Sequence, residues 1–114
     1  MKPFMQDGHI LALRAVRAVL GRDCALTMVI ESIETVDWAS ATFVGKRHIC
    51  ELRLEAACAE LDQAVERLSR DLPEAEVATT RYFLADVALT GSELSVGKEE
   101  CCARITIEAL TIEV

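Results

Sequence analysis

The chain has 114 residues, the length of one domain (residues 1–114) that can bury a core without disulfide or metal support. Apolar residues make up 52% of the sequence, which excludes a disordered chain, and aromatic residues only 4%, so the expected core is aliphatic. The net charge of −7 argues against nucleic acid and anionic membranes as partners, because both attract positive surfaces.

The N-terminal segment and the cysteines predict a cytoplasmic protein. Arg14 and Arg17 interrupt the apolar run that a secretory leader would need, and no stretch is long enough to span a membrane. The five cysteines form no regular framework, which favours reduced thiols, with Cys58 buried as a small hydrophobe. Cys101 and Cys102 are adjacent and point to opposite faces of a strand, so we predict no metal site. No glycine-rich phosphate loop occurs, and we predict no cofactor.

Two amphipathic helices are predicted, over residues 8–20 and 56–71. In the first, apolar side chains recur every three or four residues: Ile10, Leu13, Val16 and Leu20. Asp7 is its expected N-cap, and Gly21 is expected to close its C-terminus in a left-handed conformation. The sequence therefore predicts that the first helix ends just before Gly21.

Four strands are predicted from their β-branched content and their alternation: residues 25–34, 38–54, 77–89 and 102–114. Residues 35–37 are the expected turn between the first two, and residues 90–100 the loop before the last. Within 38–54 the apolar alternation changes phase, which either a bulge near Gly45 or two separate strands would explain. The third strand is expected to turn four residues toward the core: Phe83, Ala85, Val87 and Leu89.

The predicted order α-β-β-α-β-β indicates an α+β two-layer sandwich, with a four-stranded antiparallel sheet and two helices on one face. This order equals a circular permutation of the ferredoxin-like βαββαβ unit, with its first strand moved to the end. That topology predicts the sheet order 1-2-4-3. The alternative is a pair of α-β-β halves arranged in another order. Neither arrangement assigns a function, because such folds support many.

Two helices leave the second face of the sheet uncovered, and apolar side chains are expected there: Val29, Ile33, Phe43, Ile49, Tyr82 and Leu84. A homodimer would cover them, by packing sheet on sheet or edge to edge through the strand that ends at Val114. The alternative is a monomer with scattered apolar residues on its surface. The homodimer is the predicted partner state.

A cluster of basic residues, Lys46, Arg47 and His48, is the sharpest candidate site. With Trp38 on the same stretch it would suit a small anionic ligand, a carboxylate or a phosphate. Asp86 lies in an apolar strand and is the acid expected to be partly buried beside the cluster. The alternative is a solvated strand end in which Arg47 pairs with an acid on a neighbouring strand.

The leading functional hypothesis is a binding or accessory module without its own catalysis. An enzyme is the alternative, with His48 and Asp86 as an acid/base pair, or Glu51 in place of Asp86 to orient the imidazole. It requires the paired side chains to converge on a pocket. A purely structural assembly subunit is a further alternative, since the sequence contains none of the catalytic motifs that would favour an enzyme.

Overall fold

The computed structural model describes residues 8–21, 26–98 and 100–114. Its elements follow the predicted order: α1 (Gly8–Leu20), β1 (Thr27–Ala39), β2 (Val44–Ala56), α2 (Cys58–Asp71), the short 3₁₀ helix η2 (Leu72–Glu74), β3 (Tyr82–Val96) and β4 (Cys101–Glu113). The four strands form one antiparallel sheet in the order β1-β2-β4-β3. The predicted α+β class and the permuted ferredoxin-like strand order are therefore confirmed. None of the described helices is long and apolar enough to cross a membrane.

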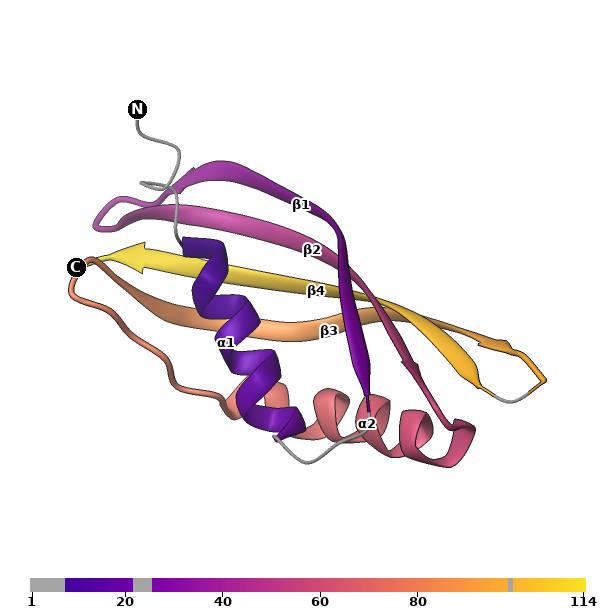
Figure 1. Cartoon of the computed structure of the whole chain (residues 1–114). Helices are drawn as coiled ribbons and strands as arrows, with labels where there is room; N and C mark the ends of the chain where they lie inside the picture. Colours follow the sequence, from indigo (N-terminus) through magenta and orange to yellow (C-terminus); the bar gives the residue numbers. More distant parts are fainter. Residues whose placement is uncertain (1–7, 22–25, 99) are drawn as a thin grey trace.

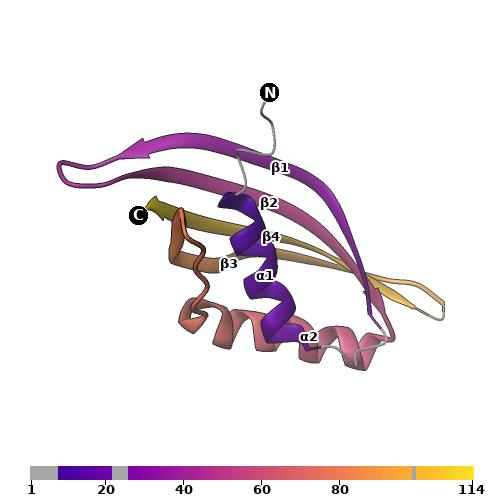
Figure 2. The same ribbon diagram turned by 60° about the vertical axis from the view of Figure 1, so that its left-hand side comes forward.

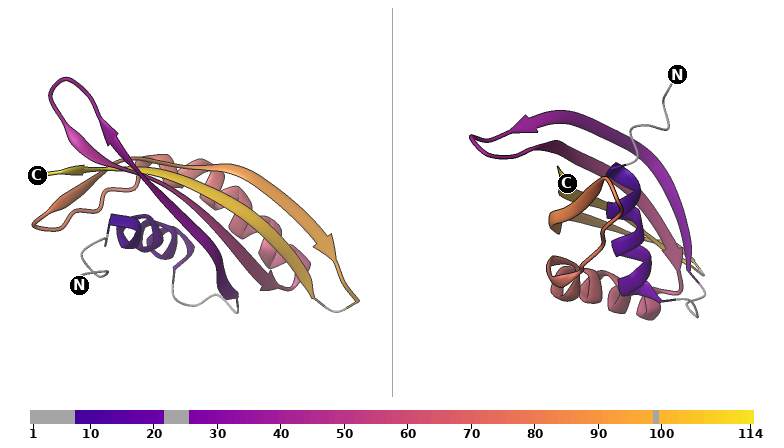
Figure 3. Two further views of the ribbon diagram at one scale, coloured as in Figure 1. Left: turned by 90° about the horizontal axis from the view of Figure 1, so that it is seen from above. Right: turned by 90° about the vertical axis from the view of Figure 1, so that its left-hand side faces the viewer.

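Both helices of the described chain lie on one side of the sheet, which curves around them (Figures 1 and 2). The view from above shows the second face of the sheet bare (Figure 3). We call the helix side the covered face and the other side the open face. The tip of the β1–β2 hairpin rises away from the helices, as the twist of the sheet accumulates toward that end.

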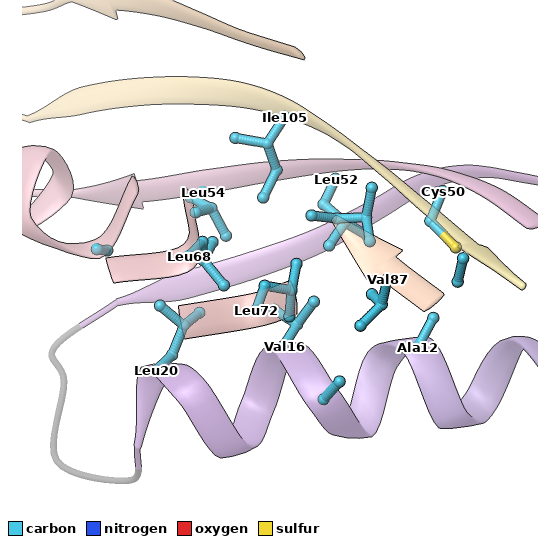
Figure 4. Packing of buried hydrophobic residues seen from close by; sticks show 14 of the residues in the cluster. Ala12, Val16, Leu20, Cys50, Leu52, Leu54, Leu68, Leu72, Val87 and Ile105 are labelled. Carbon is cyan, nitrogen blue, oxygen red and sulfur yellow. The ribbon is translucent and has the colours of Figure 1, made fainter. Parts of the chain in front are cut away.

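The hydrophobic core lies between the helices and the two central strands (Figure 4). Ala12, Val16 and Leu20 of α1 point toward the sheet and are buried. Of the four apolar residues predicted to face the core, Val16 and Leu20 are buried, but Ile10 and Leu13 are only half-buried. Ile10 and Leu13 line a groove of about 1000 Å³ between α1 and β1.

The C-terminus of α1 is closed as the sequence predicts. Gly21 has a φ of 82°, a left-handed conformation that glycine adopts without strain. Its N–H donates to the carbonyl oxygen of Arg17 at 2.9 Å. Arg67 of α2 also donates to the carbonyl oxygen of Leu20 at 3.2 Å, so the second helix helps to satisfy the end of the first. The predicted N-cap, Asp7, lies outside the described residues.

The first hairpin differs from the prediction. Residues 35–37 continue β1, and the turn falls at residues 40–43. The hydroxyl of Ser40 accepts hydrogen bonds from the N–H groups of Thr42 and Phe43, which is turn chemistry that the sequence offers only weakly. Gly45 therefore lies near the start of β2, in regular register with Trp38 and not at a bulge. The phase change in the sequence comes from two separate strands.

Bulges are present elsewhere, and one of them changes the faces of β3. The register with β4 shifts between Leu84 and Asp86, so Ala85 is the extra residue. Before it, Tyr82 and Leu84 are buried on the covered face. The prediction of a core position is thus wrong for Phe83 and Ala85, which are exposed, and correct for Val87, which follows the bulge.

β3 also extends to Val96, so most of the predicted loop 90–100 is strand. The register shifts a second time between Leu89 and Gly91. At the end of this hairpin the N–H of Gly97 donates to the carbonyl oxygen of Glu100 at 3.0 Å and closes a short turn. The long β3–β4 hairpin therefore reaches well past the helices, as Figure 1 shows.

Two of the cysteines contradict the expectation of reduced thiols. Cys58, the exposed first residue of α2, forms a disulfide with buried Cys101 at the start of β4. Their Cα atoms are 5.0 Å apart, a normal separation for such a bond. The end of β2 runs directly into α2, which brings the two thiols together. Cys50, which is buried, and Cys102, which is half-buried on the other face, are free.

Candidate interaction surface

The five predicted site residues are divided between the two faces of the sheet. Trp38, Arg47 and Asp86 belong to the open face. His48 and Lys46 belong to the covered face, where His48 pairs in register with buried Ala109. Neighbours along a strand point to opposite faces, so a cluster that is continuous in sequence is divided in space. The predicted anion site therefore retains Arg47 as its one open-face cation among these residues.

His48 is fully buried and its ring nitrogens have partners in the chain. Nδ1 lies 2.9 Å from the hydroxyl of Thr35, and Nε2 lies 2.9 Å from the hydroxyl of Thr111. Thr111 in turn donates to the carbonyl oxygen of Lys46 over a long 3.5 Å. This direction fits an imidazole protonated at Nε2 that donates to Thr111 and accepts from Thr35 at Nδ1. Gly8 closes the site, because an added Cβ would lie only 2.9 Å from Nε2.

Burial, together with the nearby charges of His9 and Lys46, lowers the pKa of His48 to about 4. The imidazole is therefore neutral at physiological pH. Asp86 is exposed on the opposite face. The hypothesis of a His48–Asp86 acid/base pair is wrong on this geometry, and Glu51 also lies on the open face. His48 is a satisfied core histidine.

Lys46 is engaged by a carboxylate of its own hairpin. Its ammonium forms an ion pair with Asp37, directly across the β1–β2 ladder. The hydrogen bond to Asp37 raises the pKa of Lys46, and the same contact lowers the pKa of Asp37. Asp37 is exposed, so the pair adds little stability. It does remove Lys46 as a free cation for a ligand.

The open face has two ends of different character. Toward the β1–β2 turn, apolar side chains occupy two adjacent cross-strand rows and form what we call the apolar patch: Val36, Trp38, Phe83, Leu110 and Ile112. Toward the other end the face is charged and internally paired. There Arg53 binds Glu31 at 2.9 Å and Glu55 at 3.0 Å, while Arg104 approaches Glu31 at 3.4 Å.

The apolar patch is partly open to solvent. Val36 is 50% exposed and Phe83 38%, whereas Trp38 and Leu110 are half-buried. Ile112 is only 3% exposed, although it lies outside the core cluster under the helices. In its row, Gly45 separates Ile112 from Trp38. A Cβ at position 45 would overlap the carbonyl oxygen of Thr111, so glycine is required for the close approach of β2 and β4.

Sequence reasoning named only part of this surface. It placed Trp38 and Arg47 at a site, and it expected apolar residues on the uncovered face. Of the six residues it expected there, Val29 and Ile49 are on the open face. Tyr82, Leu84 and Ile33 turn to the covered side, and Phe43 is exposed in the hairpin turn. The apolar stretch around Leu110 and Ile112 was the available signal for the missed part.

Comparison with known proteins adds structural similarity but no family. No family model and no curated protein matches the chain. Among solved structures, a chain from the "Virion of native gene transfer agent (GTA) particle" is similar over 82% of this chain and 73% of its own length. The identity is 15% and the TM-score 0.48. At that level the similarity supports no functional conclusion.

Proposed function

We propose that this protein is a small assembly module, an accessory subunit that forms a homodimer through the apolar patch and has no catalysis of its own. The observation that carries the proposal is the set of apolar side chains in two adjacent rows at one end of the open face, among which Val36 and Phe83 are exposed. Contiguous apolar surface of this kind marks interaction sites. Aromatic residues such as Trp38 and Phe83 are those on which binding energy concentrates.

The sheet topology supports face-to-face packing over the edge-to-edge alternative. β4 ends at Glu113 and lies between β2 and β3, so both of its sides are already paired. The strand that leads to Val114 therefore cannot offer a free edge. The sheet edges belong to β1 and β3. The apolar patch extends across the open face from β1 to β3, where a second sheet can pack about 10 Å away.

Two finer predictions remain proposals. A small anionic ligand would depend on Arg47, since Lys46 is paired with Asp37 and His48 is buried. A cytoplasmic location is likewise still a prediction. The Cys58–Cys101 disulfide argues against a cytoplasmic location, because such bonds persist mainly in oxidising compartments.

The proposal is tested by sedimentation velocity over a concentration series. We expect the natural chain to pass from monomer to dimer, and we expect Val36→Ser and Phe83→Ser to weaken the association by about tenfold or more each. Val96→Ser is the matched control, because Val96 is 74% exposed but lies at the far end of β3. It should leave the association unchanged.

Thermal unfolding of each variant checks that the fold is intact. Both substituted side chains are well exposed, so the midpoints measured on the monomer should stay close to that of the natural chain. A natural chain that stays monomeric at millimolar concentration would contradict the proposal. So would patch variants that associate as strongly as the Val96→Ser control.

A further inference from the structure

The charges at the apolar patch select one orientation for the second copy, an inference that rests on the proposed function. Arg47 and Asp86 lie in one cross-strand row, on either side of Leu110. Neighbouring strands are about 4.8 Å apart, so these two backbone positions are roughly 10 Å apart. Within residues 8–21, 26–98 and 100–114, neither side chain takes part in an ion pair.

This unpaired state contrasts with the charged end of the same face. There both Arg53 and Arg104 have carboxylate partners within the chain. Arg47 is half-buried, and it stands between apolar Val36 and Leu110 in its row. A cation in such surroundings loses hydration without gaining an intrachain partner. A carboxylate of a second molecule would supply the missing complement.

Two copies that meet face to face are related by a two-fold axis lying between their sheets. An axis that runs across the strands along this row would place Arg47 opposite Arg47 and Asp86 opposite Asp86. An axis that runs along β4, through Leu110, exchanges the two sides of the row. We propose that the homodimer uses this second axis, so that Arg47 of each copy pairs with Asp86 of the partner subunit.

The reach of the side chains fits this arrangement. Packed sheets lie about 10 Å apart, a gap that an extended arginine and a facing aspartate can bridge together. The symmetry forms the contact twice, once on each side of the axis. Leu110 then faces Leu110 on the axis, which gives the centre of the interface the apolar character expected of it.

The neighbouring row is compatible with the same axis. In this row Phe83 and Gly45 flank Ile112, so the rotation sets Phe83 of one copy opposite Gly45 of the partner subunit. Phe83 projects from the sheet with 38% of its surface exposed. Gly45 is buried and has no side chain, so it places no side chain opposite the ring. An axis across the strands along this row would instead bring the two phenyl rings onto one another.

Charge reversal tests the orientation, with the dimer dissociation constant measured by sedimentation equilibrium at low and high salt. Arg47→Glu should weaken the dimer by about tenfold or more, because the new carboxylate of each copy would face Asp86 of the partner subunit. Asp86→Arg should weaken it similarly. The double variant should restore the constant to within about threefold of the natural value, and high salt should shrink all of these differences.

Arg104→Glu is the matched control, since Arg104 is an open-face arginine at the charged end and the axis along β4 sets it opposite Arg104 of the partner subunit, so that like charges face one another before and after the reversal. It should leave dimerisation unchanged. If the single reversals leave the dimer dissociation constant unchanged, or if the double variant does not restore it, the proposed orientation is wrong. The proposed self-association is not affected by either result. A natural chain that remains monomeric overturns both. Equal thermal stability of the monomers shows that the reversals act between copies and not within one.

Discussion

Arg47 and His48 are neighbours in sequence, yet they lie in opposite surroundings. His48 on the covered face has a threonine hydroxyl 2.9 Å from each ring nitrogen, and none of its surface is exposed. Arg47 on the open face lies among apolar neighbours and has no ion-pair partner in the described chain. On the covered face the chain itself supplies the polar partners of His48. On the open face at this end the described chain supplies no ion-pair partner for Arg47.

This difference makes the two faces separable by experiment. Substitutions on the covered face should change the free energy of unfolding and leave association alone. Substitutions in the apolar patch should do the reverse. A covered-face change that altered association without altering stability would break the distinction.

The largest effect is expected from the disulfide, which ties α2 to the covered side of β4. Cys58 and Cys101 are 43 residues apart. In the loop-entropy description, cross-linking a loop of this length raises the free energy of the unfolded chain by about 4 kcal/mol. The Cys58→Ser, Cys101→Ser double variant should therefore unfold at clearly lower urea concentration. Its dimer dissociation constant, measured below the unfolding transition, should match that of the natural chain.

Cys102→Ser is the control for this experiment, because Cys102 is free and only half-buried. It should unfold with the natural midpoint. Reduction of the natural chain with dithiothreitol should reproduce the double variant. Equal urea midpoints for oxidised and reduced protein would show that the bond contributes nothing to folding.

A somewhat smaller effect is expected from acid, through His48. Its folded pKa of about 4 lies below the ordinary value of 6.5, so the unfolded chain binds the proton more readily. Its contribution to stability is complete above about pH 6.5 and is lost as the pH falls toward about 4, by roughly 3 kcal/mol in total. Urea unfolding at pH 7, 6, 5 and 4.5 measures this loss.

His48→Gln isolates the part due to the histidine. Glutamine keeps a donor and an acceptor for Thr35 and Thr111 but does not titrate. The variant should start from lower stability at pH 7 and fall less steeply between pH 6.5 and 4.5 than the natural chain. Parallel curves for the two proteins would mean that His48 is not the group that titrates.

The parts of the fold that follow from local pattern were predictable. The helix over 8–20, its Gly21 cap and the strand order all follow from periodicity, cap chemistry and short connections. The predictions that were wrong concern the face of the sheet to which a side chain points, which a single extra residue in a strand can change. Ala85 adds one residue to β3, and every side chain before it exchanges faces. Alternation in the sequence cannot reveal such a bulge, because Phe83 and Leu84 are equally acceptable on either face.

The candidate site shows the same limit. The sequence placed Trp38, Arg47 and Asp86 at a site, and they do share the open face. His48 is next to Arg47 in the sequence but faces the helices, because consecutive residues of a strand point to opposite faces. The turn at residues 40–43 sets which residues face the helices, and its position depends on weak hydrogen bonds of Ser40. The position of the turn could not be derived from the apolar pattern.

The smallest effect, and the sharpest for the orientation of the dimer, is expected at Glu108. This residue lies on β4 one row beyond Leu110 on the open face, between Ile49 and Ala88, and is half-exposed. An axis along β4 brings the two Glu108 carboxylates toward one another, where like charges cost roughly 0.5–1 kcal/mol. Glu108→Gln should therefore tighten the dimer by a few-fold, and added salt should remove the gain.

Glu51→Gln is the control, because Glu51 is a neighbouring carboxylate of the same face that lies off the axis on β2. It should have no such effect. An unchanged or weaker dimer in Glu108→Gln would mean that the axis does not follow β4.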